Sequence, residues 1–184
     1  TAAEMHAVFD GLPGCESAVA NTLAIAQMVE DDVLPEAKMR LPRFPVPEGF
    51  IDAAAYLHHK VREGAIRRYG TQWPAALAPR LRFEMDVIVN AGLPDYMLIV
   101  EDLVSWARTH GILVGPGRGS AAGSCIAYCL GITNVEPLAN GLLVERFLNP
   151  ERAGLPDVDI DFEAAHKNRI TAYLAGKYGA DRVA

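Results

Sequence analysis

Residues 112–130, ILVGPGRGSAAGSCIAYCL, place a glycine-rich turn between a short apolar run and a longer apolar segment. The run at 112–114 predicts a strand, and the segment after the glycines predicts a helix. Glycine lets a backbone approach a ligand closely, and the start of a helix presents unpaired N–H groups at the positive end of its dipole. This order predicts an α/β or α+β fold with an anion site where a strand ends.

The side chains of this loop favour phosphate but leave the kind of ligand open. Arg118 offers a planar fork of donors, and Ser120 adds a hydroxyl. A Walker loop is excluded, because no Gly-Lys-Ser/Thr is present. The dinucleotide fingerprint G-x-G-x-x-G/A with a later acid is also matched, by Gly117, Gly119, Ala122 and Glu136. A Rossmann-like oxidoreductase domain is therefore the alternative, and a plain tight turn is a third interpretation.

A second constraint lies at 155–163, LPDVDIDFE, where acidic and apolar residues alternate. Residues two apart share one face of a strand, so a strand here has an apolar face and a carboxylate face. The apolar face carries Val158, Ile160 and Phe162, and the opposite face carries Asp157, Asp159 and Asp161. Crowded carboxylates stay ionised most easily around a cation, and Mg²⁺ prefers carboxylate oxygens. The alternation predicts a metal-binding strand, or otherwise a solvated acidic face.

A phosphate loop and an acidic strand in one chain indicate a nucleoside triphosphate bound with Mg²⁺. Two-metal sites of this kind clamp the attacking and leaving oxygens of an in-line displacement. Asp157 and Asp159 are the predicted ligands of two Mg²⁺ ions, and the loop would hold the triphosphate. Arg146 and Arg152 precede the acids. They are candidates for stabilising charge on the triphosphate, or they pair with neighbouring glutamates at the surface.

The remaining pattern is mostly helical. Helices are predicted at 2–9, 16–30, 51–69, 76–90 and 101–111, a strand at 95–100 and a proline-rich linker at 35–49. Together with the strands at 112–114 and 155–163, this predicts an α+β fold. It would consist of a mixed α/β sheet with helices, preceded by a helical N-terminal part.

The composition of the chain limits which partners it is expected to bind. The chain has 184 residues and a net charge of −6, so contact with DNA would need a local basic patch or other segments. No apolar run approaches the roughly 20 residues of a membrane span, and no signal peptide is visible, so we expect a cytoplasmic protein without a membrane partner. Cys15, Cys125 and Cys129 lack metal-site spacing and are predicted to be reduced packing residues.

The two motifs together resemble the palm of the C-family bacterial DNA polymerases. The similarity is carried by GPGRGSAAGSCIAYCLGITNVEPLANGLLVERFLNPERAGLPDVDIDF at 115–162 and by RLRFEMDVIVNAGLPDYMLIVEDLVSWARTHGILV at 80–114. The segments before these also look like the family, so the resemblance covers nearly the whole chain. It implies a palm of the polymerase-β-like nucleotidyltransferase type and a DNA-directed DNA polymerase activity.

The resemblance also implies roles for individual residues. Gly119 and Ser120 would form the family's Gly-Ser motif, with Arg118 beside the dNTP triphosphate, and Arg146 in VERF would contact the triphosphate. Asp157 and Asp159 would hold the two catalytic Mg²⁺ ions, with Asp161 in a supporting role. The implied partners are primer–template DNA and dNTP, and in the intact protein the sliding clamp and other replisome subunits.

The resemblance sets the expected extent of the chain. We expect 1–50 to be a helical segment and linker that follow a PHP domain, and 51–184 to be the first part of the palm. The thumb, the fingers and the family's third catalytic aspartate have no counterpart in this sequence, and EAAHKNRI is less basic than the family's helix start at that point. We therefore expect a segment that is inactive alone.

Overall fold

The computed structural model describes residues 1–29, 41–148 and 156–183. Predictions that fall on 30–40 or 149–155, including those for Arg152 and for the first part of the linker (35–40), lie outside the described residues. The chain divides into two compact units, Thr1–Arg40 and Leu41–Ala184, and each is described by itself.

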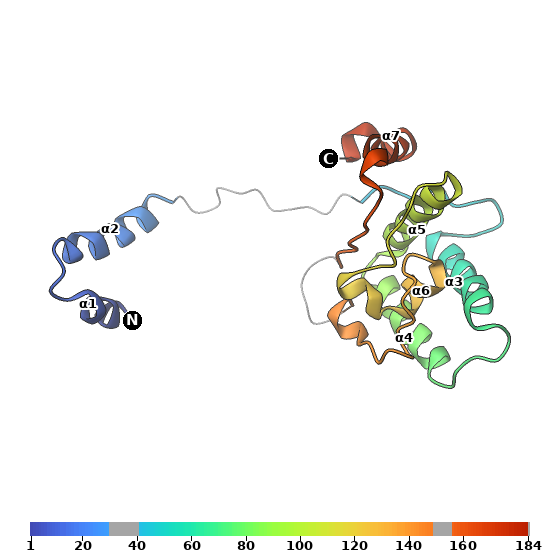
Figure 1. Ribbon diagram of the computed structural model, residues 1–184, viewed down its shortest axis with the longest axis horizontal. Coiled ribbons are helices and arrows are strands. Elements are labelled where there is room, and N and C mark those ends of the chain that lie inside the picture. The colour runs from blue at the N-terminus through green and yellow to red at the C-terminus, as the bar shows by residue number, and fades with distance from the viewer. Residues whose placement is uncertain (30–40, 149–155, 184) are drawn as a thin grey trace. The chain divides into compact units, whose positions relative to one another are not determined.

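The first unit contains α1 (Ala2–Phe9) and α2 (Cys15–Gln27), which confirms both helices predicted there (Figure 1). A capping box starts α1: the Glu4 amide donates to Thr1 Oγ1 at 3.3 Å, and Thr1 Oγ1 donates to Glu4 Oε2 at 2.9 Å. No side chain of α2 is buried. Leu23 and Ile25 are among its exposed apolar residues.

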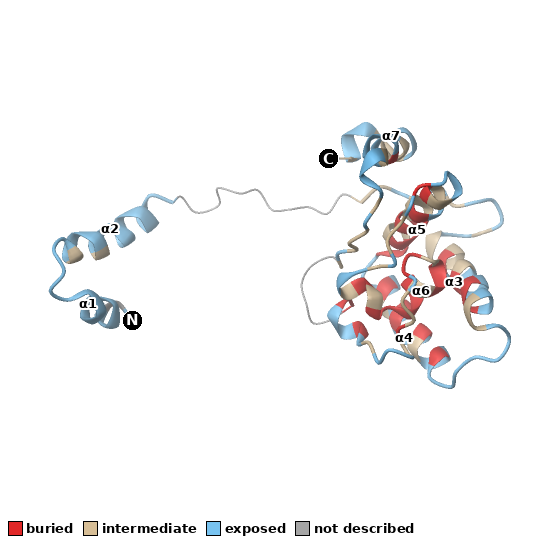
Figure 2. Ribbon diagram, in the orientation of Figure 1, coloured by how far each residue is buried: buried red, intermediate tan, exposed pale blue. Residues whose placement is uncertain are grey.

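The second unit is a group of helices joined by short 3₁₀ turns. Its helices are α3 (Ala53–Tyr69), α4 (Leu77–Asn90), α5 (Pro94–Thr109), α6 (Cys125–Leu130) and α7 (Lys167–Tyr178). The 3₁₀ turns are η1 (Gly119–Gly123), η2 (Val144–Arg146), η3 (Ala164–His166) and η4 (Ala180–Arg182). The buried side chains gather where α3, α4 and α5 surround α6, as the red segments of Figure 2 show.

The short helix α6 lies at the centre of this core. It packs against both α3 and α4. A Cβ on Gly64 of α3 would lie only 2.6 Å from the carbonyl carbon of Cys129, so the two backbones touch. Cys125 and Cys129 are reduced and buried, and burial raises the pKa of both thiols to about 12. These two cysteines are therefore packing residues, as predicted.

The mixed sheet predicted from the sequence is not formed by the residues that the structure describes. Their only β pairing is one isolated antiparallel bridge, between Val114 and Phe162. The predicted strand at 95–100 is wrong, because these residues form the first half of α5. Pro94 begins this helix, where its missing N–H costs nothing, and Met97, Leu98 and Val104 are buried at helical spacing. The helix predicted at 101–111 is the second half of α5.

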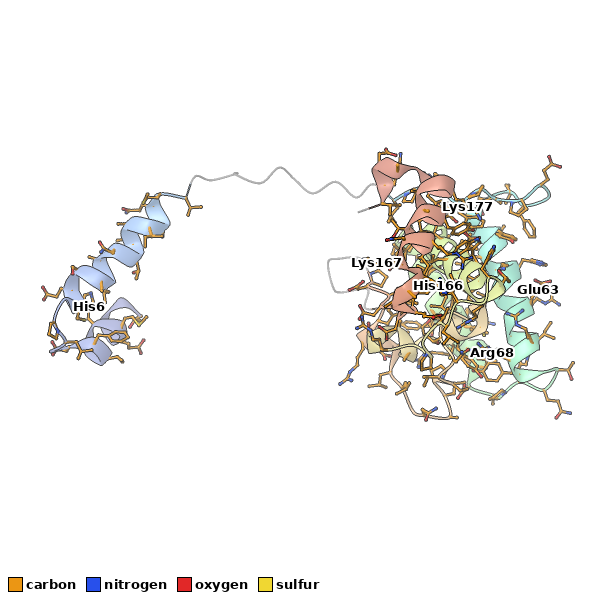
Figure 3. The ribbon with its side chains drawn as sticks, turned by 45° about the horizontal axis from the view of Figure 1, so that its top comes forward. His6, Glu63, Arg68, His166, Lys167 and Lys177 are labelled. Carbon is orange, nitrogen blue, oxygen red and sulfur yellow. The ribbon has the colours of Figure 1, made fainter. Side chains whose placement is uncertain are left out.

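Helix α7 is fastened to α5 through one carboxylate. Asp102 accepts hydrogen bonds from Tyr173 at 2.6 Å, from Tyr178 at 2.8 Å and from Lys177, labelled in Figure 3, at 2.7 Å. The ring of Trp106 stacks on Tyr173 with centroids 4.3 Å apart. Burial and the bond to Asp102 raise the pKa of both tyrosines. These contacts fix the helix that follows the acidic segment.

Among the described helices, none combines the length and the apolar character that crossing a membrane requires.

Candidate functional site

The glycine loop and the acidic segment, predicted separately, lie side by side. The Gly115 amide donates to the Asp161 carbonyl at 2.8 Å, and the Glu163 amide donates to the Leu113 carbonyl at 3.1 Å. These bonds flank the Val114–Phe162 bridge. Two segments more than 40 positions apart in the chain therefore form a single site.

Arg118 joins the two motifs through its side chain. Its Nη1 lies 3.1 Å from Asp159 Oδ2, and its Nε lies 3.1 Å from Asp161 Oδ1. The Arg118 side chain is 54% exposed, so solvent screens both pairs, and each contributes roughly 0–1 kcal/mol. In this structure Arg118, which is predicted to bind the triphosphate, therefore pairs with two of the three aspartates, and its single positive charge offsets one of their two negative charges.

Backbone conformation and close neighbours favour glycine at two positions of the loop. Gly119 has φ +65°, and a Cβ there would lie 3.1 Å from Asp159 Oδ2. Gly117 has φ +108°, and a Cβ there would lie 2.8 Å from Thr133 Cγ2. L-residues avoid this region of φ, so both positions favour glycine. Ser120 lies next to Gly119 in η1 and is half-buried.

The predicted alternation of the acidic segment is confirmed for its apolar side. Val158 and Ile160 pack against the main core, and Phe162 packs against a smaller cluster that contains Ile112 and Ile170. Asp157 is exposed. The apolar side chains thus hold in place the segment that carries the carboxylates, although no ladder of strand hydrogen bonds among the described residues supports it.

Tyr96 is a site residue that the sequence analysis missed. Its hydroxyl accepts a hydrogen bond from the Val158 amide at 3.2 Å, so α5 holds the backbone between the first two aspartates. Burial raises the pKa of Tyr96, and the charges of Asp157 and Asp159 raise it further. Reading 95–100 as a strand hid this residue, because only the helix brings its side chain to the acidic segment.

The donor chemistry of Asp157 and Asp159 fits Mg²⁺, which takes one or two carboxylates and keeps several waters. Within the described ranges, no group of three or more His, Cys, Asp or Glu residues is arranged to hold a metal ion. One oxygen of Asp159 is also engaged by Arg118. The metal assignment of Asp157, Asp159 and Asp161 therefore stays a prediction.

Arg146 ends η2 and is exposed. This turn packs against η1, the turn that carries Gly119 and Ser120. A Cβ on Gly123 would lie 3.1 Å from the carbonyl carbon of Leu143, so the two turns meet without an intervening side chain. The structure thus brings the turn that ends at Arg146 next to the glycine loop.

One expected feature of the loop is wrong. The first amides of α6, the helix after the glycines, are not free for a ligand, because Cys125 and Ile126 each donate to the Glu84 carboxylate at 3.0 Å. That carboxylate is fully buried on α4. Sequence reasoning missed Glu84, since a lone acid in a helical pattern carries no motif.

The acid needed by the dinucleotide alternative has a different role. Glu136 accepts hydrogen bonds from the Tyr69 hydroxyl and from the Ala139 amide. Its carboxylate is thus used to hold a turn against α3, and the parallel sheet of a dinucleotide fold is not formed by the described segments. The geometry does not favour a Rossmann-like oxidoreductase.

Comparison with known proteins agrees with the two motifs. The family model of the bacterial DNA polymerase III alpha NTPase domain matches residues 55–184. The DNA polymerase III subunit alpha of Mycobacterium tuberculosis is 50% identical over 188 residues, covering 100% of this chain and 15% of that protein. Those of Halalkalibacterium halodurans and Thermus aquaticus are 45% and 38% identical, covering 100% of this chain and 16% and 20% of the two relatives.

The chain thus spans between 15% and 20% of the length of these curated relatives. The resemblance read from the glycine loop and the aspartates is confirmed at the level of the family. The chain belongs to the bacterial DNA polymerase III α family.

Proposed function

We propose that this chain is part of the catalytic subunit of a DNA-directed DNA polymerase and forms the first part of a palm of the polymerase-β-like nucleotidyltransferase type. Residues 51–184 would be this palm segment, and 1–50 would link it to a preceding PHP domain. The partners of the intact protein would be primer–template DNA, dNTP, the sliding clamp and other replisome subunits, in the cytoplasm.

The observation that supports this proposal best is the pairing of the glycine loop with the acidic segment. A nucleotidyl transferase needs a donor-rich loop for the triphosphate next to carboxylates for Mg²⁺. Gly115 contacts Asp161 at 2.8 Å, and Arg118 contacts Asp159 at 3.1 Å. A loop that only turned the chain would not need an arginine between two of these carboxylates.

The side chains of the candidate site would have two separate roles, metal binding and triphosphate binding. Asp157 and Asp159 would hold two Mg²⁺ ions, which supply charge neutralisation and orient the reacting oxygens. Arg118, Gly119 and Ser120 would bind the triphosphate, together with Arg146. The primer 3′-oxygen forms a bond to the α-phosphorus while the bond to the bridging oxygen breaks, so pyrophosphate leaves and the hydroxyl proton passes to solvent.

Binding would require Arg118 to exchange partners. In this structure the Asp159 carboxylate pairs with the Arg118 guanidinium, and both side chains are about half-exposed. Such a pair is worth roughly 0–1 kcal/mol, so a triphosphate can recruit the arginine at little cost and leave the carboxylate for the cation. This exchange would couple triphosphate binding to metal binding.

The proposal predicts that the intact subunit loses nucleotide incorporation in the double variant Asp157→Asn/Asp159→Asn, because both metal ligands lose their charge. The measurement is primer extension, with Asp86→Asn, an exposed acid of α4, as the control. We expect incorporation to fall by about three orders of magnitude or more, since charge stabilisation by bound metal is a principal contribution to this chemistry. Full activity of the double variant would overturn the assignment.

The isolated chain provides a second test. We expect it to be inactive alone but to be stabilised against heat by dNTP only when Mg²⁺ is present, because a ligand of the folded state raises stability by RT ln(1 + [L]/Kd). The stabilisation should vanish in the double variant. Stabilisation by NAD without Mg²⁺ would instead favour the dinucleotide reading, and template-directed incorporation by the chain itself would contradict its proposed inactivity.

A further inference from the structure

A buried ion pair of α4 lies directly beneath the glycine loop. Glu84 is fully buried, and Arg80 one helical turn earlier donates from Nε to its Oε1 at 2.9 Å. The Ser124 hydroxyl donates to Glu84 Oε2 at 2.7 Å and in turn caps α6 by accepting from the Ala127 amide at 3.0 Å. With the two α6 amides described above, the carboxylate has four donors. Its charge is therefore fully satisfied, which a buried carboxylate requires.

A second nitrogen of the Arg80 guanidinium donates to the backbone of two chain segments of the candidate site. Its Nη2 donates to the Gly123 carbonyl at 3.0 Å and to the Leu142 carbonyl at 3.2 Å. Gly123 ends η1, and Leu142 lies two residues before the start of η2. One planar guanidinium therefore binds the end of the glycine loop, the approach to the turn of Arg146 and the carboxylate that caps α6.

This arrangement does more than stabilise a core. A buried ion pair is often no better for stability than apolar side chains of the same volume, so its presence alone explains little. Here, however, the fork of Arg80 spans two chain segments, and Gly123 of one segment packs directly against the backbone of Leu143 in the other. An apolar residue at position 80 could fill the volume but could not hold the two carbonyls in register.

We propose that Arg80 and Glu84 are positioning residues of the triphosphate site. They hold η1 and η2 in one fixed arrangement, so that Gly119 and Ser120 on the first turn and Arg146 on the second converge on the same triphosphate. Neither residue touches the ligand. This inference rests on the proposed function, and it assigns to α4 a role that the loop and the acidic segment do not share.

The variant that tests it best is Arg80→Lys in the intact subunit. Lysine keeps the positive charge for Glu84 but cannot donate in a plane to three acceptors, so the carboxylate stays paired while the register is loosened. Arg82→Lys, an exposed arginine of the same helix, is the matched control. Glu84→Gln removes the carboxylate charge and is paired with Asp86→Asn.

The readouts are KM for dNTP, kcat, affinity for primer–template DNA and the midpoint of thermal unfolding. We expect Arg80→Lys to raise KM for dNTP about tenfold or more, since displacements near 1 Å of binding groups cost up to about a hundredfold in rate. Affinity for primer–template and the unfolding midpoint should stay near those of Arg82→Lys. Amide hydrogen exchange within 119–123 should become faster in Arg80→Lys alone.

The opposite pattern would overturn the proposal. If Arg80→Lys lowers the unfolding midpoint while KM for dNTP and exchange within 119–123 stay unchanged, the pair is only a core ion pair. Should Glu84→Gln fail to fold, the lysine variant still decides the question. Failure of the proposed function would look different. The unaltered subunit would incorporate no nucleotide, or Asp157→Asn/Asp159→Asn would leave incorporation intact. In either case, amide exchange within 119–123 would still show whether Arg80 positions the glycine loop.

Discussion

Arg118 is central to the candidate site, because it lies beside the proposed positions of both the cation and the anionic triphosphate. Its guanidinium pairs with both Asp159 and Asp161, and its positive charge offsets part of the repulsion between the carboxylates. In the proposed function, a cation that took over this role would free the arginine for the triphosphate. The loop and the acidic segment are already linked through Arg118 in this structure, so binding of one proposed ligand would favour binding of the other.

The closeness of Gly119 to Asp159 leads to a prediction at this scale. Gly119→Ala should cost about 1–2 kcal/mol of stability, because φ is +65°, and should also push the Asp159 carboxylate away from Arg118. Gly141→Ala is the control, since φ is +60° but no atom lies within 4 Å of its Cβ. Equilibrium unfolding should show similar losses for the two, and only Gly119→Ala should weaken Mg²⁺-dependent dNTP binding. Equal binding by both variants would contradict the role of this contact.

Residues with a strong local pattern could be predicted, and those without one could not. The three aspartates at alternate positions and the arginine among glycines are unusual enough in sequence to indicate a candidate site, and the structure brings them together. Glu84 and Tyr96 reach the candidate site through neighbours as far as 42 and 62 positions away in the chain. Nothing in their local sequence separates them from ordinary helical residues, so only the fold places them at the site.

At the scale of elements, α6 is the feature around which the second unit is built. It has only six residues, too few to be stable as a helix alone. Glu84 satisfies its first amides, Arg68 donates to the Tyr128 carbonyl at 3.1 Å, and Arg67 donates to the Cys129 carbonyl at 3.2 Å. Side chains of α3 and α4 thus replace the hydrogen bonds that further helical turns would have provided.

The contact between α3 and α6 predicts a large loss of stability for Gly64→Ala. A Cβ at this position would lie 2.6 Å from the Cys129 carbonyl carbon, so the helices must separate. We expect a loss of about 3 kcal/mol, at the upper end of the range for overpacked cores. Gly176→Ala on α7 is the control, because nothing lies within 4 Å of its Cβ, and it should stabilise by about 0.5–1 kcal/mol. Similar unfolding curves for the two variants would contradict this packing.

Elements were predictable where their apolar spacing was clear. The helices expected at 51–69 and 76–90 are α3 and α4 within two residues at each end. The run DYMLIV at 95–100 is rich in residues that favour strands, but Pro94 and the buried faces of Met97 and Leu98 select a helix. Burial of this helical face thus outweighs the strand propensity of these residues. The acidic segment is held by side chains and one bridge, a support that alternation alone cannot distinguish from a sheet.

At the scale of the whole molecule, the two units differ in how they are stabilised. Every buried apolar residue of the described chain lies between Leu57 and Ile170, in the second unit. We therefore expect deletion of 1–40 to leave the thermal unfolding midpoint of the remainder unchanged. Deletion of 167–184 is the comparison, and it should lower the midpoint because Ile170 and the bonds to Asp102 are lost. A fall of the midpoint after deletion of 1–40 would contradict this division.

The pairing of Arg118 with Asp161 across 43 positions also has a consequence for the order of folding. Contacts between distant residues form late, because the chain between them must first give up the entropy of an open loop. The helices around α6 are complete in sequence before the aspartates are. A chain that grows from its N-terminus can therefore assemble the scaffold first, and the acidic segment closes onto it afterwards.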